Sequence, residues 1–304
     1  MTSTKPLRAA LLTNAIFSLG CALLMGLAPK LVGSWLGFQA AWILRGIGLG
    51  LGLFAADLIH QATRPRLLTW RALYASTADF LWVVGTLVGL ALFAGALSQL
   101  GLAIVLAVAA IVFAVGSWQL WGIHCAHWMP TTRRYRHCLR VQVNAPATAL
   151  GEIVTSIGDI HRYMESLQSS KILGDRQPGV GAVRQCTNHS GQSWAEECVA
   201  FEAGHSFVVR FLAEDPDFPF PAKAMVGGWT VTPVEKGSEV MVWWELVPKP
   251  ALLAPVLLPI LAFQVDRDFP PVVQNMAASA LDNTVEGVSS SPLRFGAKLM
   301  PRWC

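Results

Sequence analysis

The chain has 304 residues, a formal net charge of +4, 53% hydrophobic residues and 14% charged residues. A soluble domain usually carries about 25% charged residues, so this composition is typical of a protein with a large membrane part. The sequence contains no basic stripe interleaved with aromatic residues. This excludes the usual nucleic-acid-binding surface and predicts no nucleic-acid partner.

Four apolar segments of about 20 residues or more occupy the N-terminal part of the chain, and each is long enough to cross a bilayer as a helix. They are residues 9–28, 41–62, 72–97 and 100–123. We therefore predict a four-helix transmembrane domain over residues 1–127. The first segment is also compatible with a cleaved signal peptide, because Lys5 and Arg8 precede its apolar run.

Basic residues gather at one end of these segments, and this asymmetry predicts the orientation. That end carries three groups: Lys5 and Arg8; Arg64, Arg66 and Arg71; and Arg133, Arg134, Arg136 and Arg140. The loops at the other end carry only Lys30. We predict an integral protein of the bacterial plasma (inner) membrane, with both termini and the C-terminal domain in the cytoplasm.

Three ionisable residues lie inside the predicted spans: Arg45, Asp57 and Asp79. Charged groups are costly in hydrocarbon, so these side chains should face the bundle interior or an interface. One interpretation is a proton or ligand path, in which Asp57 and Asp79 share a proton or a polar partner. We favour the other, polar contacts that fix helix packing, with Trp82 and Gln119 as partners. Alternating glycines, Gly46 to Gly52, form two GxxxG spacings that also predict close helix packing.

Histidine and cysteine side chains cluster after the fourth segment, at His124, Cys125, His127, His137 and Cys138. Their spacing fits no zinc-ligand pattern. We predict no metal site and no cofactor.

The C-terminal part has an ordinary globular composition with short alternating segments, which is typical of strands. We predict a basic juxtamembrane linker over residues 128–139, a folded domain over residues 140–281 and a flexible tail over residues 282–304. The predicted order is one strand, two short helices, six strands and a long helix over residues 263–281. The expected strands are residues 139–143, 169–173, 182–188, 193–202, 206–213, 224–233 and 239–247.

Several of these segments resemble the polyketide cyclase/START-like (helix-grip) superfamily. The resemblance covers residues 138–281 and is carried by RVQVNAP at 140–146, IGDIHRYM at 157–164, PGVG at 178–181, WTVTP at 229–233, VWWELVPKP at 242–250 and DRDF at 266–269. It implies an α+β fold in which a curved antiparallel sheet surrounds a long C-terminal helix, with an apolar cavity between them. Members include carriers of lipids and other apolar molecules, and cyclases or dehydratases of polyketides.

Strand alternation gives candidate cavity residues, because every second side chain shares one face. The candidates are Trp194, Glu196, Phe207, Arg210, Phe211, Met225, Trp229, Met241, Trp243 and Glu245. Glu196, Glu245 and Arg210 are the charged ones, able to orient a ligand or exchange a proton. We favour the alternative that these three are solvated charges on the outer face.

Residues 252–262 form an apolar segment interrupted by Pro255 and Pro259, too short to span a bilayer. It has three interpretations: a lid over the cavity, a segment that enters the membrane interface, or a strap on the helical bundle. We favour contact with the membrane. Phe218 to Pro221 has two interpretations, a stiff loop at the cavity mouth or a plain connector.

These features predict membrane-tethered binding, transfer or sensing of an apolar small molecule, such as a lipid, an isoprenoid or a polyketide-like compound. The expected partners are the bilayer, this ligand and other membrane proteins. One alternative is a cyclase or dehydratase that uses Glu196 or Glu245 for proton transfer. The other is a structural or assembly subunit of a membrane complex.

Overall fold

Two units make up the chain, Met1–His127 and Trp128–Cys304. The computed structural model describes residues 3–37, 40–282 and 298–299. The predicted tail over residues 282–304 therefore lies almost entirely outside the described residues.

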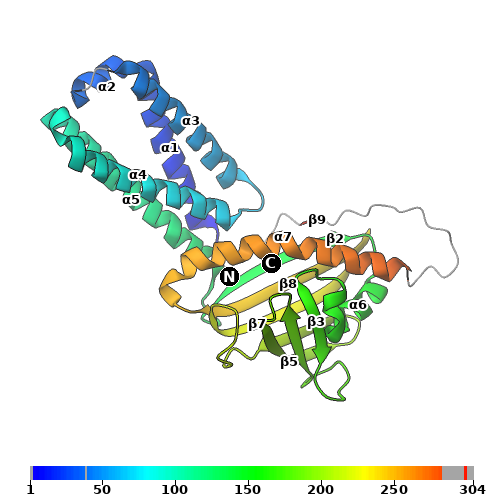
Figure 1. The fold of residues 1–304 in the computed structure, drawn as a ribbon. Helices are drawn as coiled ribbons and strands as arrows, with labels where there is room; N and C mark the ends of the chain where they lie inside the picture. Colours follow the sequence, from blue (N-terminus) through cyan, green and yellow to red (C-terminus); the bar gives the residue numbers. More distant parts are fainter. Residues whose placement is uncertain (1–2, 38–39, 283–297, 300–304) are drawn as a thin grey trace. The chain divides into compact units, whose positions relative to one another are not determined.

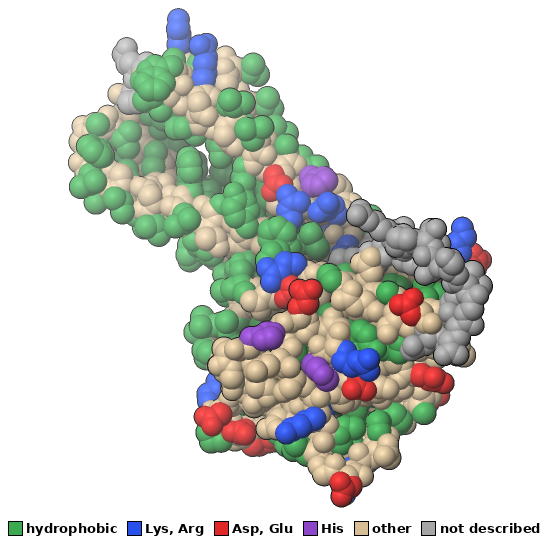
Figure 2. Space-filling view, turned by 45° about the vertical axis from the view of Figure 1, so that its right-hand side comes forward, with side chains coloured by type: hydrophobic (Ala, Val, Ile, Leu, Met, Phe, Trp, Pro, Cys, Tyr) green, Lys and Arg blue, Asp and Glu red, His purple; other side chains and the backbone are tan. Residues whose placement is uncertain are grey.

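The N-terminal unit is helical (Figure 1). Its elements are α1 (Lys5–Leu27), α2 (Pro29–Leu36), α3 (Ala41–Thr63), α4 (Thr69–Phe93), η1 (Ala94–Ala96) and α5 (Gln99–His127). Four of these helices, α1, α3, α4 and α5, are long and apolar enough to cross a membrane. This confirms the predicted membrane-type helical architecture. The face of these helices seen in Figure 2 is mostly hydrophobic or uncharged, and charged side chains gather near the helix ends.

Glycines let the helices of this unit approach closely. A Cβ added at Gly122 of α5 would lie 2.7 Å from the Leu7 Cα of α1, and one at Gly48 of α3 would lie 3.0 Å from the Ala22 carbonyl oxygen of α1. Gly46 and Gly50 have nothing within 4 Å of the same position. Only the spacing that includes Gly48 therefore serves helix packing.

The three predicted intramembrane polar residues have different surroundings. Asp57 forms an ion pair with Arg71 and accepts a hydrogen bond from Gln61. Asp79 accepts hydrogen bonds from Asn14 and Gln119, so the two carboxylates share no partner. Arg45 is exposed on α3. Of the two expected partners, Gln119 contacts Asp79 through a hydrogen bond.

The C-terminal unit is an antiparallel sheet with a long helix lying along it (Figure 1). Its elements are β1 (Trp128–Met129), β2 (Arg134–Val143), α6 (Ala147–Thr155), η2 (Ile157–Arg162), β3 (Leu167–Ile172), β4 (Val183–Asn188), β5 (Ser193–Glu202), β6 (Ser206–Phe211), β7 (Ala222–Val234), β8 (Gly237–Pro248), η3 (Ala251–Leu253), α7 (Ala254–Asp282) and β9 (Lys298–Leu299). The strand order is β1-β2-β8-β7-β6-β5-β4-β3, with β9 paired to β2. The predicted helix-grip fold is confirmed.

The core of this unit lies between the sheet and its helices. Val240 and Val242 of β8 are fully buried, as is Val273 of α7. Alternate residues of β8 point to the two faces of the sheet, which is the period expected for a strand. The same buried cluster includes Leu150 and Val154 of α6, so both helices cover the face of the sheet that forms the cavity.

Two predicted boundaries differ from the structure. Residues 128–139, expected to be a linker, contain β1 and the first part of β2, which pairs with β8 from Tyr135 opposite Leu246. The basic residues there face acidic ones on β8: Arg136 lies 3.9 Å from Glu245 and Arg140 lies 3.4 Å from Glu239. They were interpreted as juxtamembrane charges, although they also complement a neighbouring strand.

The long helix was expected to begin at residue 263, but α7 begins at Ala254. Pro255 was interpreted as a break, yet proline is well tolerated in the first turn of a helix because its missing N–H has no intrahelical partner there. Pro259 lies within the helix. The apolar segment 252–262 is therefore largely the first turns of α7.

Candidate functional site

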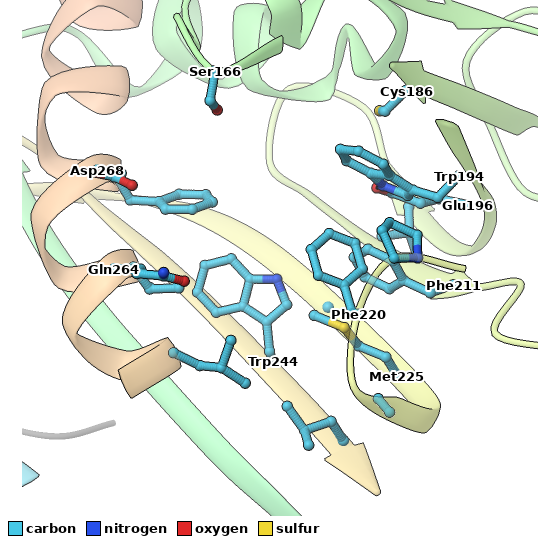
Figure 3. Close-up of a pocket in the computed structure, with 18 of the residues that line it drawn as sticks. Ser166, Cys186, Trp194, Glu196, Phe211, Phe220, Met225, Trp244, Gln264 and Asp268 are labelled. Carbon is cyan, nitrogen blue, oxygen red and sulfur yellow. The ribbon is translucent and has the colours of Figure 1, made fainter. Parts of the chain in front are cut away.

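A cavity of about 440 Å³ lies between the sheet and α7, within the usual volume range of small-molecule sites. Its walls are rich in aromatic side chains (Figure 3). The aromatic residues that line it are Trp194, Phe211, Phe220, Trp229, Trp244 and Phe269. Such a lining favours an apolar ligand, since each aromatic ring offers a large apolar surface.

Phe269 of α7 joins the helix to the sheet at this cavity. Its ring centroid lies 4.7 Å from that of Trp244 on β8, edge to face, and 5.7 Å from that of Trp229 on β7. The Trp244 ring lies close to Gly227, its neighbour on β7, where an added Cβ would approach the ring to 3.0 Å. The absence of a side chain at Gly227 thus makes room for the tryptophan.

The loop between β6 and β7 forms another wall. Phe220 packs against Trp194 at 5.1 Å and against Phe218 at 5.3 Å between ring centroids. Pro219 and Pro221 also line the cavity. Of the two interpretations of this loop, the one that places it at the cavity agrees with the structure.

Five of the ten predicted cavity residues line the cavity: Trp194, Glu196, Phe211, Met225 and Trp229. Phe207 is buried in the core, stacked on Trp229 with 6.3 Å between ring centroids. Arg210 is exposed and pairs with Glu197 and Glu214, so for this residue the alternative of a solvated charge is correct.

Met241, Trp243 and Glu245 of β8 lie on the face of the sheet opposite the cavity, and Trp244 and Leu246 line it instead. Glu245 approaches Arg136, whose guanidinium carbon lies 4.9 Å from the Trp243 ring centroid. The choice of face for β8 was therefore wrong. Both faces of this strand carry large apolar residues, so alternation alone does not distinguish them.

A buried ion pair stands in the cavity wall. Arg184 of β4 and Glu196 of β5 lie opposite each other in the sheet and form a salt bridge; they are 4% and 3% exposed. Trp194 Nε1 donates to Glu196 Oε1 at 2.7 Å, and Arg184 Nη1 donates to the Ile157 carbonyl oxygen at 2.8 Å. The carboxylate is thus held by two donors from the sheet.

Electrostatics favour the charged form of Arg184. Burial is the largest single effect and lowers the pKa of Arg184. The charge and hydrogen bond of Glu196, together with Cys186 and Cys198, raise it, so the pKa of Arg184 ends above its ordinary value. Burial and the same carboxylate raise the pKa of the Cys186 thiol to about 11. Cys186 is therefore a neutral wall residue at physiological pH.

Sequence reasoning missed Arg184, although a signal for it exists. The turn around Gly191 joins two predicted strands, and folding them about this turn pairs Cys186 with Trp194 and Arg184 with Glu196. Treating the two strands as one hairpin would have placed the arginine beside the glutamate.

Further polar groups line the cavity from α7 and β2. Gln264 and Asp268 extend from α7 toward the cavity (Figure 3). His137 Nε2 lies 2.9 Å from Asp266 Oδ1 and ties β2 to α7. Among the described residues, no group of three or more His, Cys, Asp or Glu side chains could hold a metal ion. The cavity thus combines aromatic walls with a few fixed polar groups.

Comparisons with known proteins agree with this architecture. The family model described as polyketide cyclase / dehydrase and lipid transport matches residues 138–281. A search of curated proteins found no match.

Similar solved structures include norcoclaurine synthase of Thalictrum flavum, with 15% identity over 50% of this chain and 98% of that chain and a TM-score of 0.40. The Zhui aromatase/cyclase of Streptomyces sp. R1128 has 16% identity over 51% and 96%, with a TM-score of 0.37. The di-domain aromatase/cyclase StfQ of the steffimycin biosynthetic pathway has 12% identity over 58% and 61%, with a TM-score of 0.42. At these identities the similarity concerns the fold alone. From the family model and the sheet topology, residues 138–281 are a domain of the polyketide cyclase/START-like superfamily, as the sequence resemblance predicted.

Proposed function

We propose that the C-terminal domain binds an apolar small molecule in its cavity and exchanges it with a membrane in which α1, α3, α4 and α5 anchor the chain. The observation that carries this proposal is the 440 Å³ cavity with its aromatic walls. Transferring apolar surface from water is worth roughly 25 cal/mol per Å², so such a cavity can hold a ligand with few polar contacts. The family description, which includes lipid transport, supports this class of ligand.

The polar groups of the cavity would orient the ligand. Glu196 is fixed by Arg184 and Trp194, so it can accept a hydrogen bond from a ligand hydroxyl without moving. Gln264 offers both a donor and an acceptor on the helix side. A ligand with one polar end and an apolar body matches this arrangement.

The first turns of α7 suggest the route of exchange. One face of these turns, with Leu258, Leu261 and Ala262, lines the cavity. The other face exposes the large apolar side chains Val256, Ile260 and Phe263, and Leu252 and Leu253 of η3, just before the helix, are exposed as well. Leu252 is 89% exposed and Ile260 is 46% exposed. An apolar surface of this kind on a helix is typical of contact with a membrane interface, and here it lies on the helix that closes the cavity.

Native mass spectrometry of the detergent-purified full chain, followed by organic extraction, tests the proposal. We expect a stoichiometric apolar molecule. In Ala262→Trp the indole fills the cavity, and occupancy should fall about tenfold, equivalent to about 1.4 kcal/mol. The matched control is Ala278→Trp, because Ala278 is exposed on the same helix. A protein that is always empty, or equal losses in both variants, would contradict the proposal.

The membrane route is tested by transfer of the extracted molecule between phosphatidylcholine vesicles. Ile260→Asp places a charge on the exposed face of α7 and should slow transfer without lowering occupancy. Val199→Asp, at an exposed apolar position on β5, is the control. Equal transfer rates for Ile260→Asp and the unmodified chain would exclude this surface as the entry point.

A second candidate function is cyclase or dehydratase chemistry, which the family description and the buried position of Glu196 in the cavity wall favour. Trp194→Phe keeps an aromatic wall but removes the donor to Glu196 Oε1. Loss of turnover of the extracted molecule with unchanged binding would support an enzyme. Stable copurification with other subunits, with no extractable molecule, would instead favour an assembly role.

A further inference from the structure

The N-terminal unit contains a pocket of its own, with a volume of about 310 Å³. Residues of α1, α3, α4 and α5 all contribute to it, so it lies in the middle of the bundle. Its walls are mainly apolar, with Phe17, Met25, Leu51, Phe54, Trp82 and Val112 among them. Concave apolar walls of this kind favour an apolar ligand.

One wall of this pocket is polar and centres on Asp79, which is 4% exposed. Asn14 Nδ2 donates to Asp79 Oδ2 at 2.8 Å, and Gln119 Nε2 donates to the same oxygen at 3.0 Å. Both amides are themselves fixed, since Ser18 donates to Asn14 and Ser76 donates to Gln119. Within the described part of the chain, no donor reaches Asp79 Oδ1. This oxygen is the acceptor left for a bound molecule.

The pocket supplies no positive charge for this carboxylate. The described residues that line it include no lysine, arginine or histidine, and the two hydrogen-bond donors to Asp79 are neutral amides. Asp57, the other carboxylate of the helices, is paired with Arg71 and does not line the pocket. The two acidic groups are therefore held differently, and of the two only Asp79 lines the pocket.

The glycine pattern of α3 adds an independent observation. Gly50 lines the pocket, and an added Cβ there would meet nothing within 4 Å. Helix packing therefore does not require a glycine at this position, in contrast to Gly48, which contacts α1. A side chain at residue 50 would enter the pocket, so the glycine keeps that volume open.

We propose that this pocket binds an apolar molecule whose polar group is a hydrogen-bond donor, an amine or a hydroxyl, directed at Asp79 Oδ1. The site is separate from the cavity of the C-terminal domain and does not depend on the function proposed for it. The aromatic and aliphatic walls hold the body of the ligand, and Asp79 selects its polar end. A molecule of the same size without a donor leaves the buried acceptor unpaired, which costs binding free energy.

Photolabelling of the full chain in phosphatidylcholine nanodiscs tests this site. The probes are decanol and decylamine that carry a diazirine near the end of the chain, and the competitors are decanol, decylamine and decyl methyl ether. We expect saturable labelling of peptides from α1, α3 and α4. The alcohol and the amine should compete, whereas the ether should not. Whichever of the two competes more strongly identifies the donor as an ammonium or a hydroxyl.

Two matched variants locate the labelling. Gly50→Leu fills the pocket but leaves the hydrogen bonds of Asp79 in place, and labelling should fall about tenfold. Gly46→Leu is the control, because Gly46 lies on the same helix with nothing within 4 Å of its added Cβ and does not line the pocket. Asp79→Asn should also lower labelling about tenfold, since a hydrogen bond to a charged acceptor is lost.

Three results would overturn the proposal. They are labelling that does not saturate, competition by the ether equal to that by the alcohol, and equal losses in Gly46→Leu and Gly50→Leu. Size-exclusion profiles identical to that of the unmodified chain show that a variant is folded.

Discussion

Glu196 and Asp79 are both buried carboxylates, but the two units of the protein hold them in opposite ways. In the C-terminal unit Glu196 faces the guanidinium of Arg184, so the charge is balanced within the sheet. In the helical unit the hydrogen bonds that Asp79 receives from the described residues come from the neutral amides of Asn14 and Gln119. The two carboxylates therefore require different polar groups from a ligand. The sheet cavity needs no counter-charge from a bound molecule, whereas the helical pocket still has an acceptor to satisfy.

The largest effect is expected from removing the charge of Glu196. In Glu196→Gln the Arg184 guanidinium stays buried without its counter-charge, and breaking a buried pair in this way costs about 3–5 kcal/mol. Thermal unfolding of the full chain in detergent, followed by near-ultraviolet circular dichroism, should show an earlier transition of the C-terminal unit.

The control for this prediction removes both charges together. In the double variant Arg184→Met, Glu196→Met no charge is left unpaired, so it should be more stable than Glu196→Gln. If Glu196→Gln unfolds at the same temperature as the unmodified chain, then the Arg184–Glu196 pair is solvated rather than buried. The contrast with Asp79 would then be wrong.

A smaller loss is expected from Gly122→Ala in the helical unit. The added Cβ would lie 2.7 Å from the Leu7 Cα, a contact with backbone that cannot rotate away. Overpacking of this kind costs about 1–3 kcal/mol. Gly46→Ala is the matched change at an open position and should leave the helices equally or more stable, because alanine favours helix. Far-ultraviolet circular dichroism during heating measures both, and similar melting of the two variants would contradict close packing of α1 against α5.

Asp79→Asn should cost less than either change, about 1 kcal/mol, because it exchanges one hydrogen-bonding group for another within a network of neutral amides. The measurement is the same thermal unfolding, compared directly with Glu196→Gln. This difference is the sharpest test of the contrast between the two units. A loss for Asp79→Asn as large as that for Glu196→Gln would mean that Asp79 also depends on a buried counter-charge.

The elements that could be predicted from the sequence are those with a strong local signal. The apolar runs of about 20 residues predicted the four long helices. An apolar run of that length can cross hydrocarbon as a helix, because a helix satisfies all of its backbone hydrogen bonds internally. Trp194 lies between Ser193 and Ala195, and Trp229 lies between Gly228 and Thr230. Both tryptophans line the cavity. Local periodicity was sufficient for them.

The features that were missed depend on which strands are neighbours. The cavity face of β8 is set by the helix that covers it, and the strand carries Trp243 and Trp244 side by side, so periodicity could not select between them. The partner of Arg184 is fixed by the register of the β4–β5 hairpin. The basic residues Arg136 and Arg140 were assigned to the membrane surface because their acidic partners on β8 lie about 100 residues away.

A chemical prediction concerns the thiol of Cys186, which shares the cavity wall with the ion pair. Its pKa of about 11, against an ordinary value of 9.0, reflects burial first and the Glu196 carboxylate second. Because only the thiolate reacts, alkylation by iodoacetamide at pH 8 should be about 100-fold slower than in the unfolded chain.

Removing the negative charge in Glu196→Gln lowers the pKa of Cys186, so Cys186 should then react faster, as peptide mass spectrometry can measure. Cys198, whose pKa is also raised mainly by burial, is the internal control: if its rate rises as much as that of Cys186, the variant has loosened the whole sheet. Selective acceleration at Cys186 would instead show that the Glu196 carboxylate is charged in the folded cavity wall. The sheet unit then balances its buried carboxylate with Arg184, whereas the helical unit holds Asp79 with neutral amides.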